Sequence, residues 1–399
     1  MSRHLTVPKG YREFQCAGKD CPETCCGGWE IRIDRKTMKR YKVLRREGFD
    51  FRNAVDFHKG WLMMKNGSCP LLTQGLCRIH RDLGEEYLCH TCGQYPRHKE
   101  EYGELCELSL SLSCPVAARM ILGSQEELKL RHYILNERQD KRGKGKNFQD
   151  FGEKEKEILT CLLKARSLMM SLLSRRERPL GHRLSMVLAL SCDFQSRLKA
   201  GNRGEMEKVL KRYARLESHA GYEWFQRKAA FRENRLEERY DSMAGFLSLL
   251  GELYEIYPGY LSAVSDWMDR LYRTEEGFPD YERQVETGWR EERFYENLAA
   301  YLLYIYVPGA VYDRDVKTKV KFILFSLLCI REAAILFPKE RRGDLSDSER
   351  EDVLSFLTSL VYRYSRQVEH SDENLYQIEK ALRENKNFSM EAFLRNLLN

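Results

Sequence analysis

The segment CAGKDCPETCCGGW, residues 16–29, places four cysteines within eleven positions, at Cys16, Cys21, Cys25 and Cys26. Glycine, proline and aspartate lie between them, so this is turn-rich sequence and not the apolar face of a helix or strand. Four thiols this close together indicate metal binding, disulfide bonding or inert buried cysteines. Which of these holds decides how the first third of the chain folds.

Most of the other cysteines lie in the same part of the chain. Ten of the thirteen fall between Cys16 and Cys114, and the remainder of the chain holds only three. The N-terminal stretch MSRHLTVPKGYREFQC lacks the apolar run of a secretion signal, so we expect a cytoplasmic protein whose thiols stay reduced. Disulfide bonding is therefore disfavoured, and the pattern predicts metal binding.

The spacing of the cysteines leaves the metal open between zinc and iron. A zinc finger needs paired C-x2-C knuckles, and this chain has a single one, Cys89 and Cys92. Cys25 and Cys26 are adjacent, so their side chains diverge. We expect them to serve two centres, or one of them to bind metal while the other donates a weak hydrogen bond.

Composition and periodicity predict a mainly α protein with two parts. We expect an irregular cysteine-rich metal-binding domain over residues 1–120 and a helical domain over 121–399. A short helix is expected at 35–48 with Asp34 as its N-cap. Apolar residues at three- and four-residue spacing predict a helix at 157–173. Further helices are expected at 183–199, 204–218, 222–255, 260–272, 290–307, 317–337, 348–369 and 372–385.

Local signals add detail to this division. Ser124 with Glu127 forms a capping box ahead of LKLRHYIL, residues 128–135, and Ser346 with Glu349 forms another, so a helix is expected after each. The charged stretch 138–147 predicts an exposed linker. FILFSLLCI, residues 322–330, is shorter than the roughly 20 apolar residues of a membrane-spanning helix. It predicts a buried core helix, and we expect no membrane partner.

Five blocks of sequence resemble a known family. They are FQCAGKDCPETCCGGWEIRID (14–34), CPLLTQGLCRIH (69–80), CGQYPRH (92–98), ELSLSLSCPVAARMIL (107–122) and, more weakly, FYENLAAYLLYIYVPG (294–309). Together they resemble the flagellin lysine-N-methylase family, whose cysteine cluster is thought to chelate zinc or iron. The resemblance implies methyl transfer from S-adenosylmethionine to flagellin lysines, assisted by a 4Fe-4S cluster, with zinc as the alternative metal.

Mapped onto this chain, the family pattern implies eight metal ligands. They are Cys16, Cys21, Cys25, Cys26, Cys69, Cys77, Cys92 and Cys114. Cys89 and Cys106 fall outside the pattern and are weaker candidates. His80 and His90 are near these cysteines and are candidate ligands or hydrogen-bond donors to a ligand, although a packed or exposed histidine is the simpler interpretation. His98 is expected at the surface.

Residues near the cluster are candidates for a pocket that holds the lysine amine. Aromatic side chains attract a cation and a carboxylate accepts a proton. The candidates are Trp29, Tyr87, Tyr95 and Glu107, and more remotely Glu296 and Asn297. For each, the simpler interpretation is structural: the aromatic rings cover the metal site and Glu296 caps or pairs on a helix. Arg97 is expected to pair with a carboxylate of the cofactor or of the protein.

Two other functions compete with methyl transfer. One is a non-catalytic, zinc-stabilised adaptor whose helices bind a partner, and nothing in the sequence excludes it. The other is nucleic-acid binding through the basic clusters 35–46 and 174–178. Because 67 basic residues are balanced by 60 acidic ones, these clusters are better explained as solvated faces, and we expect no nucleic-acid partner. The oligomeric state is left open.

Overall fold

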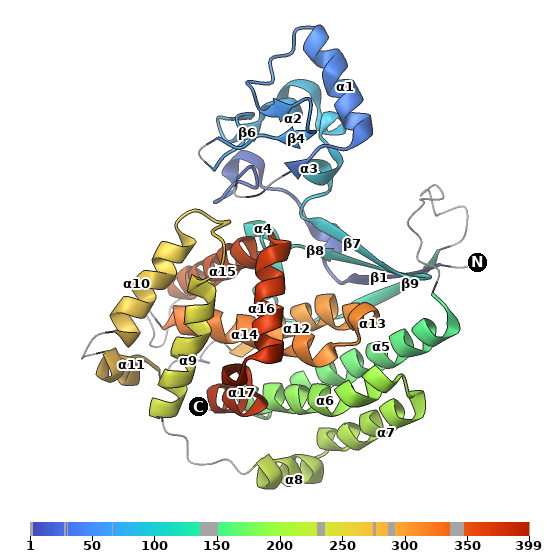
Figure 1. Ribbon diagram of the computed structural model, residues 1–399, viewed down its shortest axis with the longest axis vertical. Coiled ribbons are helices and arrows are strands. Elements are labelled where there is room, and N and C mark those ends of the chain that lie inside the picture. The colour runs from blue at the N-terminus through green and yellow to red at the C-terminus, as the bar shows by residue number, and fades with distance from the viewer. Residues whose placement is uncertain are drawn as a thin grey trace.

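The cysteine-rich part of the chain forms a small lobe at one end of the molecule, and a larger helical body lies beneath it (Figure 1). The computed structural model describes residues 3–27, 29, 31–65, 67–135, 151–229, 236–273, 277–285, 292–335 and 347–398. The small lobe contains short elements only. They are β2 (Ile31–Arg32), α1 (Arg35–Arg46), β3 (Val55–Asp56), β4 (Trp61–Leu62), β5 (Leu72–Thr73), β6 (Leu76–Cys77), α2 (Arg78–Leu83) and α3 (His90–Gln94).

Asp34 organises the small lobe from the start of α1. One carboxylate oxygen accepts a hydrogen bond from Thr37 N at 2.9 Å, and the other accepts one from His90 N at 2.9 Å. Burial raises the pKa of Asp34, but these hydrogen bonds outweigh it and lower the pKa to about 2. The predicted helix with Asp34 as its N-cap is confirmed, and the same carboxylate also fastens the start of α3.

A four-stranded sheet lies between the small lobe and the helices, in the strand order β7-β8-β1-β9. Its strands are β1 (Arg3–Pro8), β7 (Arg97–Tyr102), β8 (Leu105–Leu110) and β9 (Leu130–Leu135). β1 runs parallel to β8 and antiparallel to β9. Tyr304 of α12 (Glu292–Tyr306) donates a hydrogen bond to Leu108 O at 2.8 Å, and Tyr301 donates one to Leu110 O at 2.8 Å. Both tyrosines belong to the weakest of the five family blocks, residues 294–309, which therefore hydrogen-bonds to the backbone of the sheet.

The helix expected after the Ser124 and Glu127 capping box is wrong. Residues 130–135 form β9, which pairs with β1 along its whole length. The hydroxyl of Ser124 accepts a hydrogen bond from Glu126 N at 3.2 Å, so it closes a local turn and caps no helix. Pairing with a strand more than a hundred residues away outweighs the local helix signal.

The helical body is built around one central helix. α14 (Val316–Ala334) is buried along nearly its whole length and packs against α6, α12, α15 and α16. The other helices of the body are α4 (Pro115–Leu122), α5 (Glu153–Leu173), α6 (Leu180–Ala200), α7 (Arg203–Ala214), α8 (His219–Ala229), α9 (Leu236–Gly251), α10 (Tyr260–Tyr272), α11 (Gly277–Val285), α13 (Ala310–Asp313), α15 (Asp347–Glu369), α16 (Asp372–Glu384) and α17 (Met390–Leu397). The buried helix predicted at 322–330 and the mainly α fold are confirmed.

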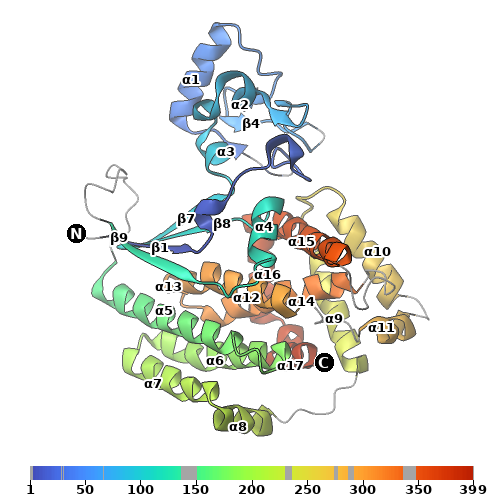
Figure 2. The same ribbon diagram turned by 180° about the vertical axis from the view of Figure 1, so that it is seen from behind.

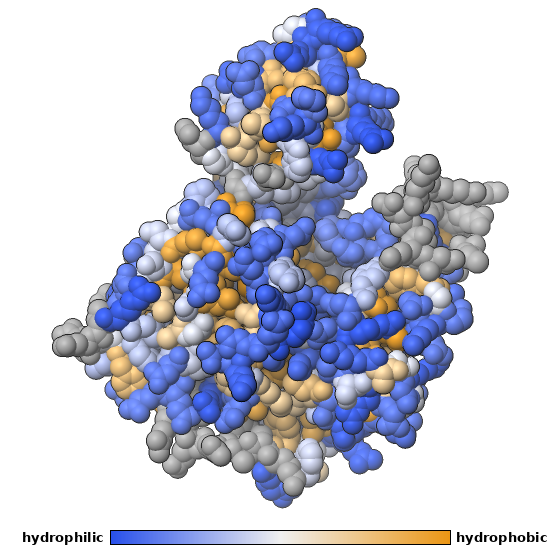
Figure 3. All heavy atoms as spheres, viewed as in Figure 1, coloured by the Kyte–Doolittle hydropathy of each residue, from blue (hydrophilic) through white to orange (hydrophobic). Residues whose placement is uncertain are grey.

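In the part of the chain that is described, no helix combines the length and apolar character needed to cross a bilayer. Figure 2 shows α5, α6 and α7 side by side on the face opposite to that of Figure 1. Hydrophilic side chains cover much of the face in Figure 3, and apolar side chains gather near α10 and α15.

Other helix predictions agree in part with the structure. The helix expected at 372–385 is α16, whose N-cap Ser371 accepts a hydrogen bond from Asn374 N. The expected helix at 222–255 corresponds to two helices, α8 and α9. The linker 138–147 and the start of the second capping box, Ser346, lie outside the described residues. The predicted division of the chain at 120/121 stays a prediction, although Tyr102, Leu112 and Ala118 belong to the core of the helical body.

Candidate metal centre at the junction of the two lobes

A cavity of about 490 Å³ lies in the small lobe where it meets α4. All eight cysteines implied by the family pattern line it: Cys16, Cys21, Cys25, Cys26, Cys69, Cys77, Cys92 and Cys114. These residues come from segments almost a hundred positions apart, so the fold gathers them around a single space. Their donor chemistry fits a soft metal or an iron–sulfur cluster, which thiolates hold.

The thiols fall into two neighbourhoods. Five belong to the hydrophobic core of the small lobe: Cys26, Cys69, Cys77, Cys89 and Cys92. Cys114 belongs to a separate cluster with Phe14 and Tyr95 at the junction. Burial raises the pKa of Cys114, and the charges of Cys21 and Cys16 raise it further, so these two thiols lie near Cys114. Cys25 is hydrogen-bonded to the adjacent Cys26, and the charges of Cys16 and Cys114 also raise its pKa, so Cys25 lies between the two neighbourhoods.

Short helices position several of the thiols. Cys77, Cys89 and Cys114 are the residues immediately before α2, α3 and α4. Burial raises the pKa of Cys77 and of Cys114, while hydrogen bonds from first-turn backbone N–H groups lower it. Those N–H groups carry partial positive charge and favour the thiolate, which is the form that binds metal.

Two pairs of thiols share a hydrogen bond. The bond from Cys25 lowers the pKa of Cys26, and the bond from Cys92 lowers the pKa of Cys89, in each case against burial. The same bond raises the pKa of each donor thiol. One thiolate in each pair is therefore favoured beside a neutral thiol, an arrangement that loses a proton when a metal binds.

Within the described ranges, no group of three or more His, Cys, Asp or Glu side chains is arranged so that it could hold a metal ion. The cavity lining gathers the sulfur donors, but it does not place them in coordination geometry. The eight metal ligands and the identity of the metal therefore stay predictions, supported by the chemistry of the donor set.

The weaker ligand candidates lie in different places. Cys89 is buried beside Cys92. Cys106 is buried in β8 opposite Leu5, outside the lining of the cavity. His80 lines the cavity and is exposed. His90 is exposed at the start of α3.

His98 is exposed on β7, as expected, with Nε2 at 3.5 Å from a carboxylate oxygen of Glu100. Arg97 lines the cavity, and its guanidinium lies over the ring of Phe14 at 5.2 Å. No ion pair joins Arg97 to a carboxylate of the described residues, so its expected pairing with a carboxylate stays a prediction.

Comparison with known proteins identifies the family. Residues 166–395, more than half of the chain, match the model of the FliB lysine N-methylase C-terminal domain. The chain belongs to the FliB lysine N-methylase family. The resemblance found in the sequence is confirmed. The matched range covers the helical body from the second half of α5 onward and none of the cysteines that line the cavity.

Individual relatives of this FliB-family chain come from Salmonella. The flagellar biosynthetic protein FliU of Salmonella muenchen is 31% identical over 149 residues, which cover 33% of this chain and 88% of FliU. Lysine-N-methylases of Salmonella typhimurium and Salmonella choleraesuis are each 31% identical over 137 residues, or 32% of this chain and 34% of theirs. The chain thus spans about a third of the length of these two methylases. No solved structure matches the chain.

The family-matched region contributes a histidine to the junction. His370, directly after α15, has Nε2 at 2.8 Å from Ser113 Oγ, and Ser113 Oγ lies 3.0 Å from the hydroxyl of Tyr95. The ring of His370 packs on Trp29 with 4.9 Å between centroids. Burial and the nearby charge of Arg366 lower the pKa of His370 to about 4, so this imidazole is neutral at pH 7.

Arg366 of α15 fastens the same junction. It is 4% exposed and donates from Nε to Ser113 O at 3.0 Å and from Nη2 to Glu23 O at 3.2 Å. The Glu23 carboxylate accepts a hydrogen bond from Tyr257 Oη. The segment that carries Cys21 and Cys25 is therefore held by the helical body. Sequence reasoning missed Arg366 and His370, because no spacing signal links them to cysteines more than 250 positions away.

Among the candidates for the amine pocket, only two aromatic residues lie at the cavity. Trp29 and Tyr95 line it, with 5.5 Å between ring centroids. Tyr87 lies outside the lining, and its ring lies beneath the guanidinium of Arg40 at 4.9 Å.

The polar candidates stabilise the fold elsewhere. Glu107 forms a buried bidentate pair with Arg166 at 2.7 and 2.8 Å. Glu296 pairs with Arg183 at 2.6 Å and with Arg176 at 2.8 Å, so the expectation that it pairs on a helix is confirmed. Asn297 donates to the carbonyls of Leu122 and Ser124 and lines a different cavity.

Proposed function

We propose that this chain is a cytoplasmic enzyme that transfers a methyl group from S-adenosylmethionine to lysine side chains of flagellin, assisted by a 4Fe-4S cluster. Three or four of the eight cysteines hold this cluster, and the others are available for a second metal centre. Membership of the FliB lysine N-methylase family supports the reaction class. The single structural observation that carries the proposal is the cavity in which all eight pattern cysteines meet the aromatic side chains of Trp29 and Tyr95.

When bound, a cluster with three cysteine ligands supplies an open iron position that can grip the amino and carboxylate groups of a cofactor. The chain's own residues supply the rest of the site. Among them, the neighbourhood that contains Cys21 and Cys114 lies at the junction with the helical body, where Arg366 and His370 also lie. This neighbourhood is therefore the better candidate for the reacting end of the cavity.

Lysine methylation requires a neutral amine. The lone pair of the amine forms the new N–C bond, the S–C bond of the sulfonium breaks, and its electron pair stays on sulfur. With an ordinary pKa of about 10.4, only about one lysine amine in two thousand is neutral at pH 7. The site must therefore favour loss of a proton from the bound lysine, by desolvation or by a nearby acceptor.

The junction contains groups suited to that task. The faces of Trp29 and Tyr95 attract a cationic amine and exclude water from it. Tyr95 Oη, Ser113 Oγ and His370 Nε2 form a hydrogen-bonded chain that leads away from the cavity to a neutral imidazole. Because the pKa of His370 is about 4, the imidazole does not keep a proton at pH 7, and the chain serves to fix the position of the Tyr95 ring. We propose that desolvation between the two rings lowers the pKa of the bound amine, which releases its proton to water.

Two measurements test the proposal. Oxygen-free purification followed by analysis for iron, sulfide and zinc, with a visible spectrum, identifies the metal. Incubation with purified flagellin and isotopically labelled S-adenosylmethionine, read by mass spectrometry of flagellin peptides, tests the reaction. We expect iron with sulfide, and label on lysine. Zinc in colourless protein without methyl transfer contradicts the proposal and favours the zinc-stabilised adaptor.

A further inference from the structure

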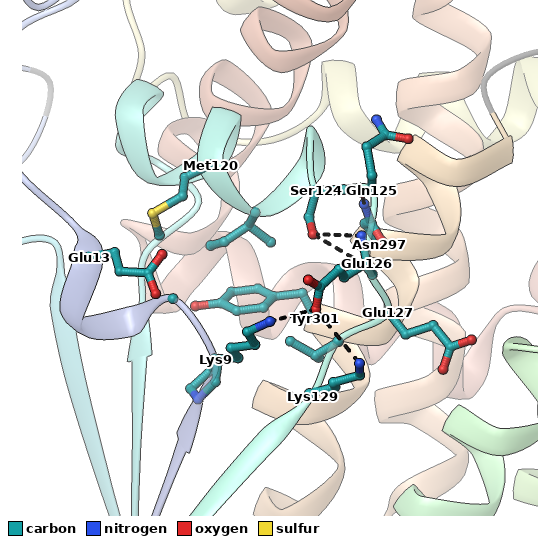
Figure 4. Close-up of a pocket in the computed structure, with 14 residues that line it drawn as sticks. Lys9, Glu13, Met120, Ser124, Gln125, Glu126, Glu127, Lys129, Asn297 and Tyr301 are labelled. Atoms are coloured by element: carbon teal, nitrogen blue, oxygen red, sulfur yellow. Dashed lines mark hydrogen bonds and ion pairs between the residues drawn. The ribbon is translucent and has the colours of Figure 1, made fainter.

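A second cavity, of about 390 Å³, lies on the other side of the segment that leads to the first cysteines (Figure 4). It is enclosed by the end of β1, the 3-10 helix η1 (Tyr11–Glu13), α4, the loop 124–129 and α12. The proposed reaction uses none of its lining residues.

The walls of this cavity combine apolar surface with hydrogen-bond acceptors. Met120, Ile121 and Tyr301 provide the apolar part. The charged lining residues are three glutamates and two lysines, which leaves a net charge of −1. They are Glu13, Glu126, Glu127, Lys9 and Lys129.

The glutamates differ in how far they are neutralised. Glu126 is held by both lysines, with Lys9 Nζ at 2.7 Å and Lys129 Nζ at 3.7 Å. Glu127 lies 3.7 Å from Arg176. Glu13 forms no ion pair with any described residue, so its carboxylate remains available at the edge of the cavity, as Figure 4 shows.

Asn297 supplies an independent sign of a ligand. Its side chain is 4% exposed, and its Nδ2 donates to Leu122 O at 3.0 Å and Ser124 O at 2.8 Å. No donor among the described residues meets its Oδ1, which is not among the buried atoms without a partner, and the residue lines the cavity. An amide oxygen open to the cavity is an acceptor for a ligand that carries an N–H donor.

The second cavity adjoins the cysteine cavity. Glu13 lines the second cavity, and the next residue, Phe14, lines the cysteine cavity. On α4, Val116 lines the cysteine cavity and Met120, one turn later, lines the second. Four residues of helix advance about 6 Å. A polypeptide in extended form advances about 3.3 Å per residue, so about two residues cover this rise, and side chains two residues apart point to the same side of an extended chain.

We propose that the second cavity binds a basic side chain, lysine or arginine, of the substrate protein, about two residues from the lysine that enters the cysteine cavity. The inference rests on the proposed function. The apolar stem of the basic side chain packs on Met120, Ile121 and Tyr301, and its cationic end reaches Glu13 and the amide oxygen of Asn297. The carboxylate of Glu13 and the amide oxygen of Asn297 disfavour binding of an acidic or phosphorylated segment.

Binding of short fluorescent peptides to the full-length protein tests this site without requiring turnover. Each peptide carries one central lysine, and arginine or its uncharged analogue citrulline stands about two residues away. We expect the arginine peptide to bind about three- to tenfold more tightly at low salt, as for one partly screened ion pair with a packed stem. The preference shrinks as salt is added.

Substitutions at Glu13 test whether this residue causes the preference for the arginine peptide. Glu13→Gln removes the charge of an exposed residue without an ion-pair partner, and Glu13→Lys reverses it. We expect the first to abolish most of the preference for arginine and the second to invert it. Glu384→Gln is the matched control, because Glu384 is an exposed glutamate on α16, far from the cavity in sequence, and it should leave the preference unchanged.

Equal binding of the two peptides, or a preference that survives Glu13→Lys, overturns the inference. Weaker binding of labelled S-adenosylmethionine to Glu13→Lys, with no change for either peptide, also overturns it, because the cavity would then hold the methyl donor. If the arginine preference is present but no peptide is methylated, the binding site stands and the proposed reaction fails. The two hypotheses are thereby separated.

Discussion

The two lobes are stabilised in different ways, and the comparison shows what the cysteines contribute. The helical body has one continuous hydrophobic core with α14 at its centre. Among the described residues, the core of the small lobe has eleven buried ones, two of which are Cys69 and Cys89. Three more cysteines, Cys26, Cys77 and Cys92, pack against it. In the small lobe the thiols therefore occupy positions that aliphatic side chains fill in the helical body.

This difference has a physical consequence. A small lobe with short strands and few buried apolar residues gains little from hydrophobic burial, so it depends on additional cross-links such as bound metal. The helical body needs no such support, because its large core buries apolar surface from many helices at once. Substitution of the thiols should therefore destabilise the small lobe, and disruption of the buried ion pairs should destabilise the helical body.

The largest expected effect is the loss of the small lobe when its central thiols are changed. Cys69→Ser combined with Cys77→Ser removes two predicted ligands from that core, and structural metal sites contribute on the order of 10 kcal/mol to folding. We expect hydrogen exchange in residues 31–92 to approach that of an unfolded chain, while α14 stays protected. Cys192→Ser, in the helical body, is the control. Retained protection of residues 31–92 contradicts the contrast between the lobes.

The second effect concerns the body. Glu107→Gln leaves the guanidinium of Arg166 buried without its ion-pair partner, and both side chains are 5% exposed. Breaking such a pair costs about 3–5 kcal/mol, so the denaturation midpoint of the helical body should fall clearly. Glu205→Gln removes the partner of Lys208 in a solvent-exposed pair and should leave the midpoint unchanged. Equal effects of the two substitutions contradict the prediction.

A smaller effect is expected at the junction. Arg366→Met removes hydrogen bonds to Ser113 O and Glu23 O, at a cost of about 1–3 kcal/mol. Exchange of the amides at residues 21–26 should accelerate, whereas those of α1 should not change. Arg363→Met is the matched control, because Arg363 is 48% exposed and lies 3.8 Å from the Glu23 carboxylate. The idea that the helical body positions the cysteine segment fails if α1 responds as strongly as residues 21–26.

The smallest effect is a pH dependence in the small lobe. The pKa of Asp34 is lowered from 3.8 to about 2 in the folded state, so its contribution is present above pH 3.8 and is lost as pH falls through about 2. Because Asp34 is only partly buried, screening reduces this contribution to about 1 kcal/mol or less. Asp34→Asn should destabilise the small lobe at pH 7 and make little difference near pH 2. A constant difference across that range excludes the carboxylate as the cause.

Local sequence signals predicted correctly those elements whose local preference agrees with their tertiary contacts. Asp34 before α1 and the apolar run within α14 identified a capped helix and a buried helix, and both are present. The turn signal of Ser124 with Glu127 led to a wrong helix, because the pairing of β9 with β1 depends on a strand far away in sequence. Local sequence likewise predicted only part of the candidate site. Trp29 and Tyr95 are close to cysteines in sequence and were predicted, whereas His370 is distant from them and was missed.

The sequence by itself determined that the N-terminal third is rich in thiols on turns, that a long helical region follows, and which family both parts resemble. These properties depend on residue type and local spacing, which the sequence states directly. Only the tertiary structure decided that the eight cysteines share a cavity, that Cys25 donates a hydrogen bond to Cys26, and that α15 brings Arg366 and His370 to them. Contacts between distant segments depend on how whole elements pack, and no local pattern encodes that packing.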